Sequence, residues 1–307
     1  METSKFKLYL GEVRAPFFTA TIIPVILGSV IAWSSFDTFS WGYFFLTLFG
    51  AILIQAGANV ANDYWDHRSG NDEANTEFLR PYTGGSRMIQ KGLLAPKEVL
   101  TEALLLLAAG SLIGLFLTYM KGMEILYMGL FGVLSGYFYT APPFKLVFRG
   151  IGEMFIGIDF GILLTVGSFY VQTGYFALEP LVASLPIAML VAGILYINEF
   201  QDYKADKEVG KNHLVARMGR KRAAVGYGYI MWLTYVFIVI GVILGMISPW
   251  TLLGLITIPI AVKAVRTAKV HYDDYLKLAP ANVGTIMSHL LTGLMMTIGY
   301  MIDRWVS

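Results

Sequence analysis

The stretch NDYWDHRSGND, residues 62–72, follows an apolar run at 44–60 that contains no charged residue. It brings three aspartates and an arginine to the point where a hydrophobic segment ends. A turn needs only one Asp or Asn, and mixed charges anywhere in the chain would serve solubility. Three aspartates at this spacing therefore indicate that a positively charged ligand is held there.

The composition shows which solvent surrounds this stretch. Of the 307 residues, 56% are hydrophobic and 14% are charged, whereas soluble domains carry about 25% charged residues. Many apolar runs approach the roughly 20 residues that cross a bilayer. We therefore predict an all-α, polytopic protein embedded in a lipid bilayer. The net charge of +2 gives no sign of a nucleic-acid partner, and no protein partner is evident. With no cysteine, disulfides and thiolate chemistry are excluded.

Apolar segments predict nine transmembrane helices in a bundle, within one domain over residues 1–307. The segments are 15–33, 41–61, 99–119, 123–139, 151–171, 179–198, 223–246, 249–264 and 282–302. The eighth is short enough to be re-entrant. If the N-terminus is cytoplasmic, only Lys121 and Arg304 of the 23 Lys and Arg residues fall outside, so 21 obey the positive-inside rule. We expect a multi-pass protein of the cell membrane with its N-terminus in the cytoplasm.

A second stretch repeats the pattern of the first. NEFQD, residues 198–202, matches NDYWD, residues 62–66, in having Asn, an acid, an aromatic residue, any residue and then Asp. Each lies at the inside end of an even-numbered segment, the second and the sixth. Four helices separate them, so the two halves would have the same membrane orientation. This predicts a parallel four-helix repeat, with halves at about 11–140 and 150–264 and a ninth helix at 282–302.

The two stretches together predict a magnesium site. Asn62 and Asp66 are four residues apart, which places them on one face of a helix, and the same holds for Asn198 and Asp202. Oxygen ligands from two facing helices suit Mg²⁺, which often shares its shell with substrate phosphates. A single Asp at a helix end is usually a cap or a solvated charge, but a concentration in two equivalent loops favours metal binding. The candidate ligands are Asn62, Asp63, Asp66, Asp72, Asn198, Asp202 and Asp206.

Basic residues interleave with these acids and can bind phosphate oxygens that the metal leaves free. The candidates are Arg14, Arg68, Arg87, Lys145, Arg149, Lys204 and Lys211. For Arg149 and Lys204, anchoring under the positive-inside rule explains the charge equally well. Arg14 can instead snorkel to the membrane surface.

A third feature is YFYTAPPFKLVFRGIGE, residues 137–153, in which two prolines break the fourth helix. Tyr139 belongs either to an interfacial aromatic belt or beside a reacting cation. Glu153 and Asp159 lie in the fifth segment, where acids are costly and usually face the bundle interior. With Asn59, they are candidates for positions behind the metal ligands. His67 and His213 show no ligand spacing; they lie near the motifs, where contact with the acceptor is an alternative, and are predicted to be solvated loop residues.

NDYWD with Asp72, followed by NEFQDYKAD, on a nine-span membrane protein resembles the UbiA-type intramembrane prenyltransferase family. The resemblance covers nearly the whole chain. TGGSRMIQKGLL, YTAPPFKLVFRGIGE and DYKADKEVGKNHLVARMGR are most similar to the 1,4-dihydroxy-2-naphthoate polyprenyltransferases of menaquinone synthesis. One departure concerns the first motif, whose last Asp in the family would fall at Gly70. The nearest acid here is Asp72, so its role as a ligand stays open.

The resemblance implies a Mg²⁺-dependent prenyltransferase with its active site on the cytoplasmic side. Mg²⁺ would hold the diphosphate of a polyprenyl donor, and an aromatic acceptor would attack the allylic carbon. The residues expected to be catalytic are Asp66, Asp202, Tyr139 and Lys145. Other acceptors remain open, namely 4-hydroxybenzoate, homogentisate and geranylgeranylglyceryl phosphate. A cation-coupled transporter is the alternative from another class, because internal repeats and polar helix ends also occur there.

Overall fold

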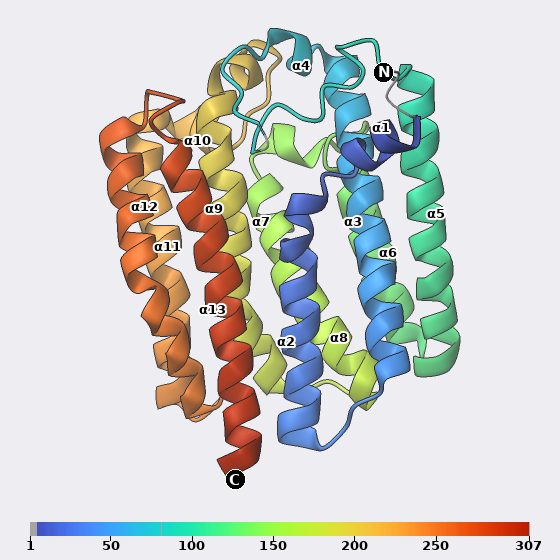
Figure 1. The fold of residues 1–307 in the computed structure, drawn as a ribbon, viewed down its shortest axis with the longest axis vertical. Coiled ribbons are helices and arrows are strands. Elements are labelled where there is room, and N and C mark those ends of the chain that lie inside the picture. The colour runs from blue at the N-terminus through green and yellow to red at the C-terminus, as the bar shows by residue number, and fades with distance from the viewer. Residues whose placement is uncertain (1–4, 81, 307) are drawn as a thin grey trace.

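The computed structural model describes residues 5–80 and 82–306, which form a bundle of long helices (Figure 1). The long helices are α2 (Thr19–Phe36), α3 (Trp41–Ser69), α5 (Pro96–Lys121), α6 (Met123–Phe138), α9 (Leu178–Glu208), α11 (Arg220–Ile243), α12 (Ile258–His271) and α13 (Ala279–Val306). The fifth predicted segment is divided into α7 (Gly152–Ile156), the π-helical η3 (Gly157–Leu163) and α8 (Leu164–Thr173). Short elements are α1 (Lys5–Glu12), η1 (Ala15–Phe18), α4 (Asn71–Ala74), η2 (Leu146–Arg149), α10 (Leu214–Met218) and η4 (Pro249–Thr257). The prediction of an all-α protein is confirmed.

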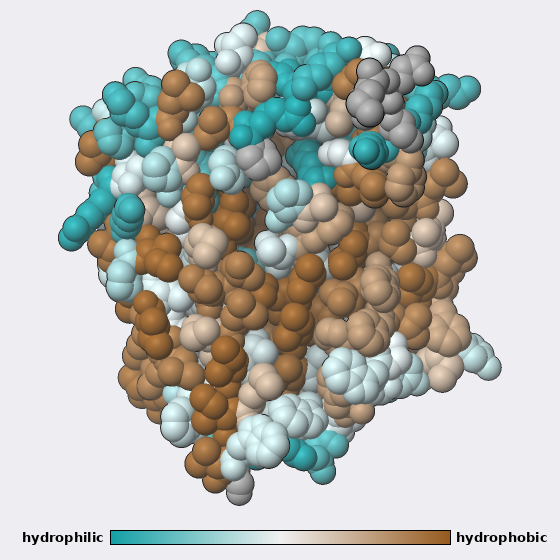
Figure 2. All heavy atoms as spheres, in the orientation of Figure 1, coloured by the Kyte–Doolittle hydropathy of each residue, from teal (hydrophilic) through white to brown (hydrophobic). Residues whose placement is uncertain are grey.

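The apolar character of these helices matches a membrane protein. Within the described chain, eight helical segments are long and apolar enough to cross a bilayer. Figure 2 shows a hydrophobic band across the middle of the face in view, with most of the hydrophilic residues at one end. The segment 123–139 forms α6, which is apolar but has only 16 residues, about 24 Å of helix against a hydrocarbon core of about 30 Å. Nine crossings therefore remain a prediction, which the placement of α1 and of the last turn of α13 at opposite ends of the bundle favours (Figure 1).

Two helices continue well past their predicted ends. The second segment was expected to end at 61 and the sixth at 198, but α3 runs to Ser69 and α9 to Glu208. The reason is that neither motif contains a glycine or proline. The first glycines beyond them, Gly70 and Gly210, have φ of 77° and 80°, the left-handed conformation that ends helices. Both motifs therefore lie on continuous helices, at the polar end that also carries α1, α4 and α10 (Figure 1).

Close helix packing determines which face of η3 is turned inward. A Cβ added to Gly161 would lie 2.3 Å from the Cα of Ala188 on α9, and one added to Gly157 would lie 3.2 Å from the Ala188 carbonyl oxygen. Such contacts between small residues let helix backbones approach closely in a membrane. Because this glycine face is pressed against α9, Asp159 and Leu163 line an internal cavity instead.

Candidate active site

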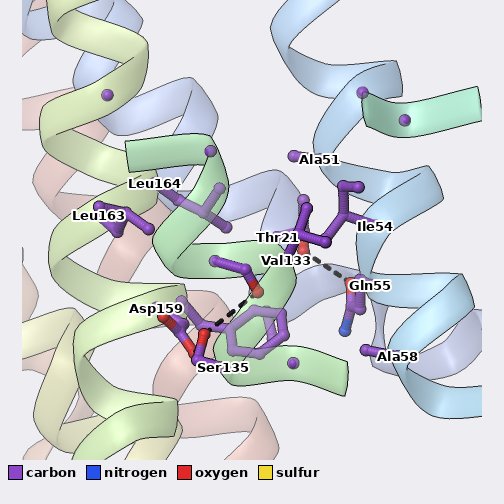
Figure 3. Close-up of a pocket in the computed structure, with 18 of the residues that line it drawn as sticks. Thr21, Ala51, Ile54, Gln55, Ala58, Val133, Ser135, Asp159, Leu163 and Leu164 are labelled. Atoms are coloured by element: carbon purple, nitrogen blue, oxygen red, sulfur yellow. Dashed lines mark hydrogen bonds between the residues drawn. The ribbon is translucent and has the colours of Figure 1, made fainter. Parts of the chain in front are cut away.

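A cavity of about 530 Å³ lies within the half of the bundle that contains α3, α5, α6, η3 and α8, with α9 forming a further wall. Its lining includes Arg14, Asn62, Tyr139 and Asn198. Along α3 the lining continues inward to Thr47, some 22 Å from Asn62 at 1.5 Å per residue. Most of this surface is apolar, and Figure 3 shows part of it. The volume falls in the range of small-molecule sites, about 300–1,000 Å³.

The polar end of this cavity, which we call the rim, is lined by Arg14, Asn62 and Asn198. The last turns of α3 carry the first motif to this rim. Asp63 accepts a hydrogen bond of 2.9 Å from the Ser86 backbone N–H and forms an ion pair with Arg14. Asp66 is 7% exposed. Asn62 lines the cavity, and its Oδ1 is buried with no hydrogen-bond partner among the described residues. This oxygen is therefore free to accept a hydrogen bond or to bind a metal ion.

The turn at Gly70 explains the departure from the family spacing. Gly70 has φ of 77°, a conformation that costs other residues roughly 1–2 kcal/mol. The chain reverses there, and α4 carries Asp72 back into the protein, where it is 3% exposed. Burial and the nearby charge of Asp66 raise the pKa of Asp72 to about 7. The structure thus brings Asp72 into the same acidic cluster as Asp66, while position 70 serves the turn.

The second motif reaches the same rim from α9. Asn198 lines the cavity, and its Oδ1 accepts a hydrogen bond of 2.7 Å from Asn282 Nδ2. Asp202 Oδ1 accepts one of 2.6 Å from Asn75 Nδ2. Asp206, one turn further along α9, is 4% exposed. The asparagine of each motif therefore lines the same cavity, and the aspartates follow it along the helix, outside the lining.

Lys211 connects the two motifs. Its Nζ lies 2.8 Å from Asp66 Oδ1 and 3.5 Å from Asp206 Oδ1, and its side chain is 7% exposed. Burial opposes the charged form, but the two carboxylates outweigh it and raise the pKa of the Lys211 ammonium. Lys211 was predicted to bind the substrate diphosphate, and the structure shows that its charge is already shared between the two motifs.

Three basic residues of the predicted site have an unusual backbone conformation. Among the described residues, four that are not glycine have positive φ, and three of these are Arg14 (54°), Arg87 (64°) and Lys145 (45°). Such conformations cost roughly 1–3 kcal/mol and cluster at ligand sites. The Arg87 guanidinium donates to the backbone carbonyls of Asp72 and Asn75, so it fixes the loop that carries these residues to the cluster.

The remaining basic candidates lie away from the cavity. Arg68, Arg149 and Lys204 are exposed, and Lys145 is half-buried beside the Phe148 ring. None of these four residues is among the described residues that line the cavity. A role in diphosphate binding remains a prediction for them. It requires the diphosphate group of the polyprenyl donor to extend out of the cavity toward these side chains.

Sequence reasoning missed the environment of His213. The prediction that it is solvated is wrong, because its side chain is completely buried. Nδ1 lies 3.1 Å from Glu199 Oε2, and Nε2 lies 3.1 Å from Asp206 Oδ2. Burial lowers its pKa, but the charges of Glu199 and Asp206 outweigh this effect and raise the pKa to about 10. His213 therefore carries positive charge and supports the carboxylate of Asp206 from behind.

Glu153 joins the same network. Its Oε1 accepts a hydrogen bond of 2.7 Å from the Leu214 N–H. Glu153, Glu199 and His213 have potential ligand atoms within 4.8 Å of one another. However, His213 Nδ1 faces Glu199 Oε2 and Nε2 faces Asp206 Oδ2. With both ring nitrogens engaged, this group is a charge network rather than a metal centre.

The other two candidates for supporting positions, Asn59 and Asp159, both line the cavity. Asn59 Nδ2 donates a hydrogen bond of 3.1 Å to the Val13 carbonyl oxygen. It therefore ties α3 to the segment that leads into η1 and helps to hold Arg14, the next residue, at the rim.

The acidic cluster fits a magnesium ion. It contains five carboxylates and three basic groups, namely Asp63, Asp66, Asp72, Asp202 and Asp206 with Arg14, Arg87 and Lys211. The charges of Asp72, Asp66 and Asp202 all act on the Arg14 guanidinium. Buried charges need compensation, and the excess here is negative. Carboxylate and amide oxygens are the ligands that Mg²⁺ prefers.

Comparison with known proteins agrees with this geometry. The model of the UbiA prenyltransferase family matches residues 21–283. The chain is 29% identical to the 1,4-dihydroxy-2-naphthoate octaprenyltransferase of Bacillus subtilis, covering 98% of this chain and 96% of that protein. It is 27% identical to the 2-carboxy-1,4-naphthoquinone phytyltransferase of Synechocystis, covering 96% and 93%.

The fold is similar to that of a UbiA homolog from Archaeoglobus fulgidus that was solved with DMAPP and Mg²⁺ bound. The TM-score is 0.59 at 14% identity, over 94% of this chain and 99% of that one. The family match covers most of the chain and includes both Asn/Asp motifs. This chain therefore belongs to the UbiA prenyltransferase family.

Proposed function

We propose that this protein transfers a polyprenyl group from a polyprenyl diphosphate to an aromatic acceptor, in a Mg²⁺-dependent reaction. The preferred acceptor is 1,4-dihydroxy-2-naphthoate, in menaquinone biosynthesis. The observation that carries the proposal is an excess of buried carboxylates next to the polar end of a long apolar cavity. The carboxylates can bind the metal of a metal–diphosphate headgroup, and the apolar cavity can hold a polyprenyl tail.

The residues that would hold Mg²⁺ are Asn62, Asp63, Asp66, Asp72, Asn198, Asp202 and Asp206. When bound, the ion would neutralise the negative charge of the diphosphate leaving group. Arg14 already lies in the cavity lining beside these acids, where its guanidinium can bind phosphate oxygens in a bidentate manner. We assign Arg14 as the basic residue that orients the diphosphate.

Other residues prepare the site for an allylic cation. Tyr139 lines the cavity, and its Oη is buried with no hydrogen-bond partner among the described residues. Its electron-rich ring can stabilise positive charge by a cation–π interaction. The apolar lining excludes water, which would otherwise capture the cation. Asp66 and Asp202 contribute through the diphosphate, and Lys145 contributes only if it moves toward the rim.

The choice of acceptor rests on the relatives. The Bacillus subtilis protein, to which this chain is similar over nearly its full length, is named a 1,4-dihydroxy-2-naphthoate octaprenyltransferase. The Synechocystis protein is named for a related naphthoquinone. We therefore rank naphthoate above 4-hydroxybenzoate, homogentisate and geranylgeranylglyceryl phosphate. The family assignment makes the protein a prenyltransferase, which removes the reason for considering a cation-coupled transporter.

The membrane arrangement is part of the same proposal. Nine crossings in the cell membrane, an N-terminus in the cytoplasm and an active site facing the cytoplasm are supported by the distribution of Lys and Arg. The parallel repeat with halves at about 11–140 and 150–264 is supported by the equivalent use of α3 and α9, each of which carries its motif to the rim.

The test uses purified protein with Mg²⁺, a labelled polyprenyl diphosphate and a panel of acceptors. The proposal predicts a prenylated product with 1,4-dihydroxy-2-naphthoate and little or none with the other acceptors. Product with a different acceptor alone would contradict the naphthoate assignment. Absence of product with every acceptor would contradict the aromatic prenyltransferase itself.

A further inference from the structure

Asp159 is an unusual residue in the cavity lining. Of the described residues that line the cavity, only Arg14 and Asp159 are charged. Arg14 lies beside the acidic cluster, whereas Asp159 belongs to a helical segment that is apolar enough to cross a membrane. An ionisable residue within a membrane span is costly and usually faces a functional interior.

The backbone at Asp159 is built to direct it into the cavity. It lies in η3, a π-helical segment of seven residues, and π-helical turns occur frequently at functional sites. Gly157 and Gly161, two residues on either side, face Ala188 on α9 at distances that leave no room for a side chain. Asp159 therefore cannot turn toward α9 without separating the two helices.

Asp159 lies farther from the polar end of the cavity than the proposed position of the diphosphate. Asp159 Oδ2 accepts a hydrogen bond of 2.7 Å from Ser135 Oγ, across the cavity wall in α6 (Figure 3). Ser135 precedes Tyr139 by four residues, which is about 6 Å along a helix. A planar molecule that lies beneath the metal–diphosphate group, beside the Tyr139 ring, would therefore have one edge near Asp159.

The second oxygen of Asp159 lacks a partner. Oδ1 is buried and has no hydrogen-bond partner among the described residues. On the opposite wall, Gln55 has its partners already, because Oε1 accepts from Thr21 at 2.6 Å and Nε2 donates to the Phe17 carbonyl at 2.9 Å (Figure 3). Leaving a buried polar atom unpaired costs free energy. The hydrocarbon tail of the donor substrate has no hydrogen-bond donor for this oxygen, whereas a hydroxyl group of the acceptor has one.

We propose that Asp159 binds a hydroxyl group of the aromatic acceptor, whose O–H donates to Asp159 Oδ1. The inference rests on the proposed function and assigns the acceptor to a position between the diphosphate and the apolar end of the cavity. Asp159 selects acceptors that carry a free hydroxyl on the ring that is prenylated. Ser135 holds the carboxylate in place through Oδ2.

The experiment compares steady-state KM values for acceptor and donor in the full chain in nanodiscs, with 1,4-dihydroxy-2-naphthoate, its mono-methyl ethers and polyprenyl diphosphate. Asp159→Ala should raise the acceptor KM by about tenfold to one-hundredfold, the effect of losing a hydrogen bond to a charged group, with the donor KM unchanged. Asp159→Asn keeps an acceptor oxygen and should recover most of this loss. Leu163→Ala, a change in the same segment, should affect the donor KM alone.

The methyl ethers provide a second check, the first half of which needs only the wild type. Blocking the hydroxyl that meets Asp159 should weaken binding to the wild type but should cause no further loss in Asp159→Ala. An unchanged acceptor KM in Asp159→Ala, or equal increases in the acceptor and donor KM, would overturn the inference while the transferase activity stands. Failure of the wild type to prenylate any acceptor would instead refute the proposed function, and the inference with it.

Discussion

Replacing Lys211 by Met tests whether the two motifs are joined by a buried ion pair. Lys211 Nζ lies 2.8 Å from Asp66 and 3.5 Å from Asp206, with only 7% of its side chain exposed. Methionine keeps the apolar volume and removes the charge, so two buried carboxylates lose their shared partner. Breaking a buried pair by removing one partner costs about 3–5 kcal/mol, and we expect this loss in the free energy of unfolding without Mg²⁺.

Lys204→Met is the matched control for this prediction. Lys204 also pairs with a carboxylate, that of Glu77, but its side chain is 67% exposed. Surface pairs contribute about 0–1 kcal/mol, so the control should be close to wild type. The assay is denaturant unfolding of both variants in detergent, with and without excess Mg²⁺.

Mg²⁺ should also stabilise Lys211→Met more than it stabilises the wild type. Each ligand that binds only the folded state adds to its stability, and the variant has more uncompensated charge for the ion to neutralise. If the two lysine variants unfolded with the same free energy, Lys211 would not be the connection between the motifs, and our account of the electrostatics would be wrong.

Two further predictions concern the backbone that positions the site. Gly161→Val should destabilise the protein by several kcal/mol or prevent folding, because a Cβ there lies 2.3 Å from the Ala188 Cα; wild-type thermal stability would contradict the packing of η3 on α9. Gly70→Asp restores the family spacing but places a side chain at φ of 77°, so it should cost roughly 1–2 kcal/mol and should not rescue the activity of Asp72→Ala. Full rescue in the double variant would show that position 70, rather than the turn, matters.

The sequence predicted the parts of this protein that depend on local pattern. Apolar runs of suitable length became helices because the bilayer leaves the backbone few alternatives. The spacing of Asn62 and Asp66, and of Asn198 and Asp202, placed each pair on one helix face and pointed to a shared site. The rim of a single cavity includes both asparagines.

The parts that failed depend on packing between distant segments. His213 follows α9 in a stretch that was predicted to be a solvated loop, yet it is buried against the carboxylates of Glu199 and Asp206. No local pattern distinguishes this position from that of exposed Lys204. The helix ends were also wrong, because a hydropathy window ends at the membrane surface, whereas α3 continues until Gly70 permits the turn.

Mg²⁺-dependent prenyl transfer by the wild type, Asp66→Asn and Asp202→Asn is the most direct test of the central claim, measured as labelled prenyl product over a range of Mg²⁺ concentrations. If Mg²⁺ holds the diphosphate as proposed, the wild type loses all turnover when Mg²⁺ is chelated. Each variant should lose about a hundredfold or more at saturating donor, the usual effect of removing one group that stabilises developing charge. Turnover by the wild type without a divalent ion, or full Mg²⁺-dependent turnover by both variants, would contradict it.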